Sequence, residues 1–326
     1  MPFWKTNDQA AIDRRSSLIN RETAMFRLND VILLLVIFSS MIAGILLPRF
    51  GSVFQPYPLY LMMFLLFLSF LSIKIDTVWQ TFQHNSRAVL WLSLLKLIIL
   101  PGAVYLLFRI FYPSYAVAAL LLTGISTGVV APFIASLVRA DGALVLVIVV
   151  ISSLMVPFTL PALVEFLLGQ TIEISFTGMV QMLCLIVFVP ILVVELLRRL
   201  IPSVLESLMK WRFPVSLIIF AVINLGVFSK YARFFQQNPL IIIEATIIAI
   251  ILGGIYFSVG FLVSWKEPVK NRLSSIICLG NVNNVLVIVF ASEFFGPLEP
   301  TLSAMYMIPF FGLILPLRLY QRIKRH

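Results

Sequence analysis

Two clusters of polar residues interrupt long apolar segments of the sequence. The first is Gly124-Ile125-Ser126-Thr127-Gly128, and the second is Gly280-Asn281-Val282-Asn283-Asn284. Glycine weakens a helix, whereas hydroxyl and amide groups bind polar solutes or ions. Backbone unwound at membrane depth is tolerated only where protein or a water-filled cavity satisfies it. The clusters therefore predict substrate-binding residues, namely Ser126, Thr127, Asn281, Asn283 and Asn284. The alternative is that these residues only cap the ends of half-helices.

Three further polar residues lie within apolar segments. Lys96 is about nine residues into its segment, or roughly 13 Å deep at ~1.5 Å per residue, which is near mid-membrane. An ionisable residue at that depth is a candidate functional group. We interpret Lys96 and Glu244 as candidate coupling residues and Asn224 as a further substrate contact. Glu244 would partner Lys96 or line an outer cavity.

Residues that would support an enzyme are scarce. The only histidines are His84 and His326, and both lie outside the apolar segments. The sequence has no HExxH pattern, no Ser/His pair within these segments and no facing aspartates. We therefore expect no enzyme activity, no cofactor and no metal site.

The composition is that of a membrane protein. Hydrophobic residues make up 61% of the 326 residues and charged residues 12%, whereas a soluble domain is closer to half apolar and a quarter charged. The mean hydropathy is +1.05. Several apolar runs are long enough to cross a ~30 Å hydrocarbon core. We expect an all-α polytopic protein with the lipid bilayer and a small solute as partners, and no nucleic acid.

The apolar runs predict ten transmembrane helices. Their ranges are 31–48, 57–74, 88–109, 114–138, 142–168, 178–197, 213–230, 239–264, 272–294 and 301–320. With the N-terminus inside, 19 of the 24 Lys and Arg residues fall in inner segments, four in outer segments and Lys96 within a span. This bias predicts that both termini are cytoplasmic, in a multi-pass protein of a bacterial inner membrane.

The two polar clusters occupy corresponding places in the two halves of the chain. They lie 156 residues apart, in the fourth and ninth predicted spans. Five spans per half require the halves to be inverted relative to each other, as in many secondary transporters. We expect an N-terminal tail over 1–30, a first five-helix repeat over 31–168 and a second over 178–320. Paired interruptions of this kind predict the substrate site of a transporter.

The order and spacing of several motifs resemble the bile acid:sodium symporter family, as a divergent bacterial-type member. The motifs are Ile73-Lys74-Ile75-Asp76, Leu94 through Pro101, Gly142 through Pro157 with Pro161, and Gly280 through Asn284. The resemblance covers most of the ten predicted spans.

The resemblance implies a fold and a mode of action. A core of helices three to five and eight to ten would face a panel of helices one, two, six and seven. The broken fourth and ninth helices would cross, with an organic anion bound beside the crossing. Transport would proceed by alternating access between core and panel, in a protein that we expect to be a monomer.

The residues that would bind sodium in this family are largely replaced. The fifth-helix hydroxyl positions align with Val145 and Val149, and no acidic residue occurs between Arg272 and Glu293. Lys96 stands where the family has a glutamine on the third helix. Sodium needs oxygen ligands of the kind that are missing here.

These replacements lead to a hypothesis about coupling. The Lys96 ammonium would occupy the place of a sodium ion and donate to the side chains or carbonyls of the two breaks. Burial disfavours a charged ammonium, so Lys96 could release a proton during the cycle, which would make the protein a proton-coupled transporter or a facilitator. Three alternatives stay open: a lysine that only fixes the crossing, a sodium symporter with altered ligands, and a sensor or scaffold without transport.

Overall fold

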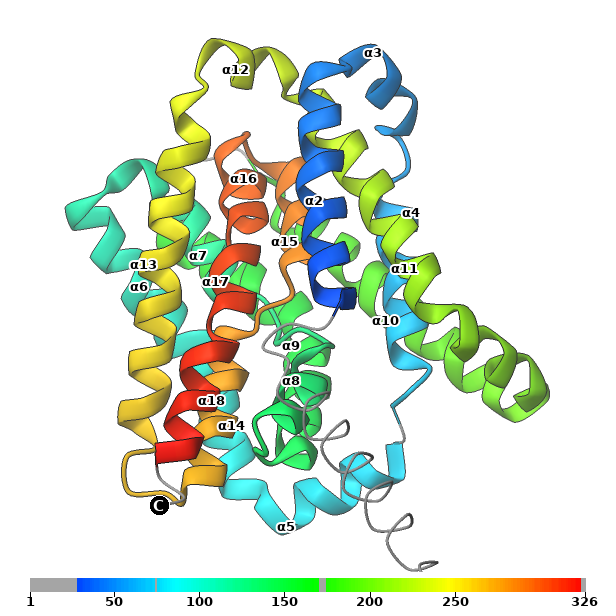
Figure 1. The fold of residues 1–326 in the computed structure, drawn as a ribbon, viewed down its shortest axis with the longest axis vertical. Helices are drawn as coiled ribbons and strands as arrows, with labels where there is room; N and C mark the ends of the chain where they lie inside the picture. The colour runs from blue at the N-terminus through cyan, green and yellow to red at the C-terminus, as the bar shows by residue number, and fades with distance from the viewer. Residues whose placement is uncertain (1–27, 74, 170–173, 324–326) are drawn as a thin grey trace, which may run out of the picture.

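The computed structural model describes residues 28–73, 75–169 and 174–323 and is almost entirely helical (Figure 1). In the first half the helices are α2 (Leu28–Leu46), α3 (Pro48–Gly51), η1 (Ser52–Phe54), α4 (Pro58–Phe70), α5 (Ile75–Leu94), the π-helical turn η2 (Leu95–Ile99), α6 (Leu100–Phe111), η3 (Pro113–Tyr115), α7 (Ala116–Gly124), α8 (Ala131–Leu137) and α9 (Gly142–Leu168).

The second half continues in the same way. Its helices are α10 (Phe176–Leu200), α11 (Pro202–Lys230), α12 (Ala232–Gln237), α13 (Leu240–Val263), α14 (Val269–Gly280), α15 (Asn284–Phe294), α16 (Leu298–Met305), α17 (Met307–Gly312) and α18 (Ile314–Ile323). The N-terminal tail that we expect over 1–30 lies almost wholly outside the described residues.

Local sequence explains where several helices begin and bend. Asp141 starts α9, because its carboxylate accepts hydrogen bonds from the backbone N–H groups of Ala143 and Leu144. Ser175 starts α10 in the same way, through the N–H of Gly178. Helix α5 is kinked at Asn85, whose φ and ψ are −121° and 25°. Its first part lies at the same end of the molecule as α14 and α18 (Figure 1).

The apolar helices support a multi-pass membrane protein. Among the described residues, six helices are long and apolar enough to cross a membrane, or seven if the bent pair formed by α2 with α3 and η1 counts as one span. Helices also lie in all ten predicted ranges, but α4, α7–α8 and α14–α15 are short or broken. The count of ten crossings therefore stays a prediction.

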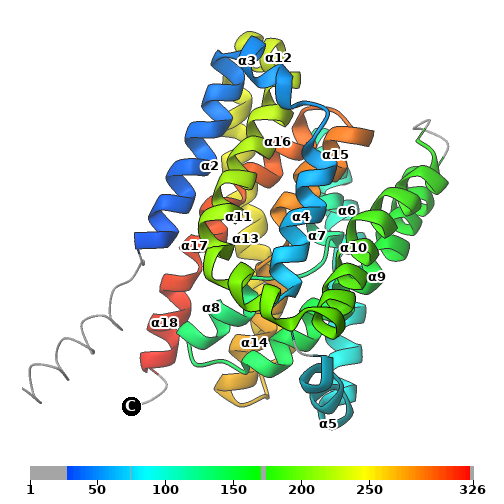
Figure 2. The same cartoon turned by 90° about the vertical axis from the view of Figure 1, so that its right-hand side faces the viewer.

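Helices from the two halves of the chain pack on one another. Helices α2 and α4 pack on α11, and α4 also packs on α10. Helix α13 packs on α14, α16 and α17, while α7 packs on α6 and α16. Helices α9 and α10 lie against each other along one side (Figure 2). Helices α7 and α15 are buried along nearly their whole length, and α14 is buried from Leu273 to its end, whereas α8 has both buried and exposed residues.

Candidate functional site

The backbones of the two breaks bind each other directly. Thr127 and Val282 form an isolated antiparallel bridge. The N–H of Gly128 donates to the carbonyl of Asn281 at 2.7 Å, and the N–H of Asn283 donates to the carbonyl of Ser126 at 2.9 Å. Each break thus satisfies backbone groups that the other leaves free. These bonds hold the end of α7 beside the end of α14.

Gly128 permits this close approach. A Cβ atom at this position would lie 2.9 Å from the carbonyl oxygen of Val282 and 3.3 Å from that of Asn281. Both neighbours are backbone atoms that take part in the contact, so they cannot move aside without breaking it. The glycine that reads in the sequence as a helix breaker is therefore required for the contact between the breaks.

Thr127 connects the breaks to a third element. Its hydroxyl donates to the carbonyl of Cys278 at 2.8 Å, in the last turn of α14. Its backbone N–H donates to the hydroxyl of Ser152 in α9 at 3.1 Å. All three residues are fully buried. The Thr127 side chain therefore joins the two breaks, and its backbone fastens them to α9.

Lys96 lies at the point where α7 and α14 end. Its side chain is fully buried, and its Nζ atom donates to the carbonyls of Thr123 at 3.0 Å and Leu279 at 3.4 Å. These carbonyls belong to the last turns of the two half-helices, where the helix dipole places partial negative charge. This partial negative charge stabilises the ammonium group of Lys96, as it would stabilise a bound metal ion. Lys96 itself sits in the π-turn η2, and π-turns often mark functional sites.

Two buried tyrosines complete the surroundings of the ammonium group. The Nζ atom of Lys96 lies 5.9 Å from the ring centre of Tyr256. The hydroxyls of Tyr256 and Thr123 are hydrogen-bonded at 2.6 Å, and the Tyr306 hydroxyl donates to the carbonyl of Gly280 at 2.7 Å. Sequence reasoning missed both tyrosines. Both tyrosines place a hydroxyl group within an apolar segment, and a buried tyrosine hydroxyl usually has a hydrogen-bond partner. This pattern in the sequence could have identified them as candidate site residues.

The remaining residues of the breaks divide into bonded and unbonded groups. The Asn283 side chain begins α15 by accepting from the N–H of Leu286 at 3.3 Å, as its capping role predicts. The Asn284 amide nitrogen donates to the sulfur of Met307. The hydroxyl of Ser126 and the amide oxygen of Asn284 are buried without a hydrogen-bond partner among the described residues. Asn281 is also buried.

Two predicted site residues lie away from the crossing. The Asn224 amide bonds the Ile37 carbonyl and the Ser40 hydroxyl, both at 3.4 Å, and so joins α11 to α2. Glu244 accepts a hydrogen bond from the Tyr112 hydroxyl, just beyond the end of α6. Within the described residues no ion pair joins Glu244 to Lys96. In this structure Glu244 is bonded to Tyr112 and not to Lys96, and its lining of an outer cavity stays a prediction.

The surroundings of the crossing offer few oxygen ligands for a cation. Val145 and Val149 are fully buried, and the Ser152 hydroxyl is already bonded to Thr127. No group of three or more His, Cys, Asp or Glu residues that could hold a metal ion occurs in the described part of the chain.

The family model of the sodium bile acid symporter family matches residues 56–238, more than half of the chain. The chain belongs to this family. The matched stretch contains Lys96 and the first break, whereas the second break lies beyond it and is connected to the first by the hydrogen bonds described above. No curated protein matches the sequence. Membership of this symporter family, with the apolar helices, makes the chain a multi-pass membrane protein of a transporter family rather than an enzyme family.

Proposed function

We propose that this protein is a secondary transporter of a small organic anion, in which the Lys96 ammonium takes the place of a coupling sodium ion. The observation that carries the proposal is the pair of hydrogen bonds from Lys96 to Thr123 and Leu279. They put the Lys96 amino group between the C-terminal ends of α7 and α14. A sodium ion bound there would need the same two carbonyls as ligands, and the ammonium already donates to both.

The packing of the helices supports alternating access between two parts. We assign α2, α4, α10 and α11 to a panel and the other long helices to a core that contains both breaks. The contacts within each group support this division. We further propose that the chain crosses the membrane ten times, in two inverted repeats over 31–168 and 178–320. Both termini would lie in the cytoplasm of a bacterium. Movement of the core against the panel would expose the breaks to each side in turn.

The chemistry of the breaks supports a polar, anionic substrate. Lys96 supplies a positive charge and forms no ion pair in the described part of the chain. Helix α15 begins at the second break with its positive dipole end. The Ser126 hydroxyl and the Asn284 amide oxygen are buried without a hydrogen-bond partner among the described residues, and a solute would bind them once the core moves and exposes the breaks. Thr127, Asn281 and Asn283 mainly position this backbone. Asn224 acts within the panel, and Glu244 lies outside the site.

Flux into proteoliposomes tests the proposal. Purified protein is offered cholate, short monocarboxylates and dicarboxylates, with sodium and pH gradients imposed separately. We expect uptake of an anion that an inward proton gradient stimulates and a sodium gradient does not. Strong stimulation by sodium would contradict the assigned role of Lys96. Binding of an anion without flux under any gradient would favour a sensor.

Variants of Lys96 test whether this residue carries a proton during transport or has only a structural role at the crossing. In Lys96→Gln the side chain still donates to carbonyls but cannot exchange a proton at neutral pH, so the response of uptake to the pH gradient should disappear. Arg109→Gln is the matched control, because Arg109 is an exposed cation at the other end of α6. A Lys96→Gln or Lys96→Ala transporter with unchanged pH dependence would leave Lys96 only a structural role.

A further inference from the structure

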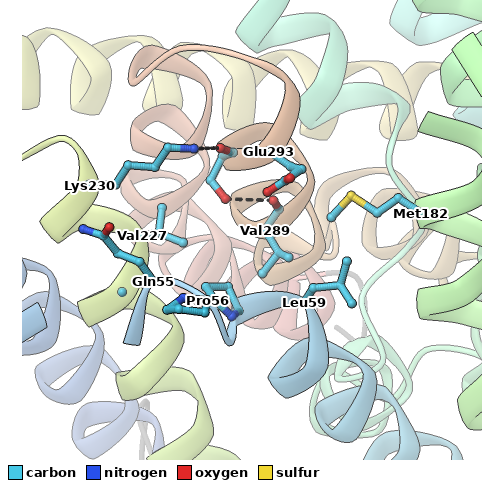
Figure 3. Close-up of a pocket in the computed structure, with 11 residues that line it drawn as sticks. Gln55, Pro56, Leu59, Met182, Val227, Lys230, Val289 and Glu293 are labelled. Atoms are coloured by element: carbon cyan, nitrogen blue, oxygen red, sulfur yellow. Dashed lines mark hydrogen bonds between the residues drawn. The ribbon is translucent and has the colours of Figure 1, made fainter. Parts of the chain in front are cut away.

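A second polar contact joins the α11 end of the panel to α15. Lys230, the last residue of α11, points to the C-terminal end of α15, where its Nζ atom donates to the Ser292 carbonyl at 2.6 Å (Figure 3). The hydroxyl of the next residue, Tyr231, donates to the same carbonyl at 3.2 Å and to that of Phe295 at 3.3 Å. Neither donor belongs to the crossing of the two breaks.

A small pocket opens beside this contact. It has a volume of about 60 Å³ and lies between the Gln55–Leu59 turn, Met182 of α10, Lys230 of α11, and Val289 and Glu293 of α15 (Figure 3). One water molecule takes about 30 Å³ of liquid volume. The pocket therefore has room for a head group the size of a carboxylate, and the rest of a larger ligand must extend out of it.

The ammonium of Lys230 is bonded to a neutral group. Its Nζ atom donates to a backbone carbonyl oxygen, and Lys230 takes part in none of the ion pairs among the described residues. The bond from an ammonium to a carbonyl is already charge-assisted, because its donor is ionised. A carboxylate in the pocket would add the attraction between two opposite charges and would therefore compete with Ser292 for Lys230.

The charge of Glu293 limits what the pocket accepts. Its carboxylate lines the same space as Lys230. A ligand that carries one negative charge can approach Lys230, whereas a second negative charge would meet Glu293 and be repelled. The pocket thus favours a monoanion over a dianion.

We propose that this pocket binds the carboxylate of a monoanionic ligand, and that Lys230 transfers its hydrogen bond from Ser292 to the ligand. The exchange removes one contact between α11 and α15 and leaves the weaker bonds of Tyr231. Ligand binding thereby loosens the panel from the core at this point. That the ligand is the transported substrate rests on the proposed function, whereas the binding itself does not.

Protection of a cysteine in the pocket tests the proposal without any flux measurement. Leu59 lines the pocket and is half-buried, so Leu59→Cys, in a chain whose partly exposed Cys184 is replaced by serine, reports access to N-ethylmaleimide. Butyrate is the probe, with butyramide as its neutral isostere and succinate as its dianion. We expect butyrate to slow alkylation saturably, butyramide to have no effect and succinate to require at least tenfold more.

Variants assign the effect to Lys230. Lys230→Met should raise the butyrate concentration needed for protection at least tenfold, whereas Lys230→Arg should preserve protection. Arg233→Met is the matched control, because Arg233 is exposed nearby but does not line the pocket. Absence of butyrate protection, equal protection by butyramide, or unchanged protection in correctly folded Lys230→Met would overturn the site. Protection by butyrate without anion flux would support the pocket and contradict the proposed transport function. Anion flux without butyrate protection would support transport and contradict the pocket.

Discussion

At the scale of single residues, Lys96 sets the character of the crossing. A buried ammonium loses its hydration, and that loss is tolerable only where good acceptors replace water. The carbonyls of Thr123 and Leu279 are such acceptors, since they end two half-helices and would otherwise lack partners. The burial of Lys96 therefore requires the two carbonyls, and the two carbonyls require Lys96 as a hydrogen-bond donor.

We predict that Lys96→Met destabilises the protein. The change keeps an unbranched side chain but leaves two buried carbonyls without a donor, at a cost of about 1–3 kcal/mol in the free energy of unfolding. Thermal unfolding in detergent should show a midpoint lower than that of Arg109→Gln. A Lys96→Met protein more stable than the native chain would instead mean that the charge is held at a cost, which favours a role in transport over a role in folding.

Replacement of Thr127 should lower the stability of the protein by less than replacement of Lys96. Thr127→Val keeps the shape of the side chain and removes the bond from its hydroxyl to the Cys278 carbonyl. We expect a loss of about 1 kcal/mol, measured by the same unfolding midpoint. Thr159→Val is the matched control, because its hydroxyl bonds only the Met155 carbonyl of its own helix on an exposed face. Equal effects of the two changes would mean that the Thr127–Cys278 bond adds nothing to stability.

At the scale of elements, the breaks illustrate what sequence can and cannot provide. Glycine, serine and asparagine within apolar runs predict where α7 and α14 end, because these residue types oppose a continuous helix. The bridge between Thr127 and Val282 is a tertiary contact between segments far apart in the chain, so no local pattern encodes it. The sequence analysis expected only that the two broken helices cross, and that expectation depended on the family resemblance.

Several helices also differ from what their composition predicts. The third predicted range begins at 88, but α5 begins at Ile75, and the π-turn around Lys96 has no signal in hydropathy. Asn224 is a polar residue in an apolar helix, which is also where a ligand-binding residue would be expected. Its side-chain amide instead donates to the Ile37 carbonyl of α2. Polarity within a span predicts that a side chain needs a partner, but not whether the partner is a ligand or another helix.

The contact between the breaks predicts opposite outcomes for two glycines. Gly128→Ala should destabilise the protein by about 1–3 kcal/mol and reduce transport, because the added methyl group meets the Val282 carbonyl at 2.9 Å. Gly102→Ala is the matched control in α6, where nothing lies within 4 Å of the added atom. That change should leave stability unchanged or raise it by up to about 1 kcal/mol. Similar unfolding midpoints for the two variants would contradict the close approach at Gly128.

At the scale of the whole molecule, charge and architecture bear on the same question. The turn after α2 and the connection between α13 and α14 lie at opposite ends of the bundle (Figure 1). Among the described residues, the connection between α13 and α14 carries Lys266 and lies next to Lys270 and Arg272, so the positive-inside rule predicts that this end faces the cytoplasm. The pocket at Lys230 then lies towards the outside, because α11 ends near the turn that follows α2.

Labelling of single cysteines in intact cells decides this orientation. Val53 in η1 and Pro268 in the connection between α13 and α14 are exposed, and neither is charged, so their replacement leaves the charge bias unchanged. A membrane-impermeant maleimide should label Val53→Cys in intact cells and Pro268→Cys only after permeabilisation. The native chain is the control, since Cys278 is buried and Cys184 only partly exposed. The reverse pattern would invert the protein and turn the Lys230 pocket towards the cytoplasm. An organic anion would then meet that pocket when it leaves the cell rather than when it enters.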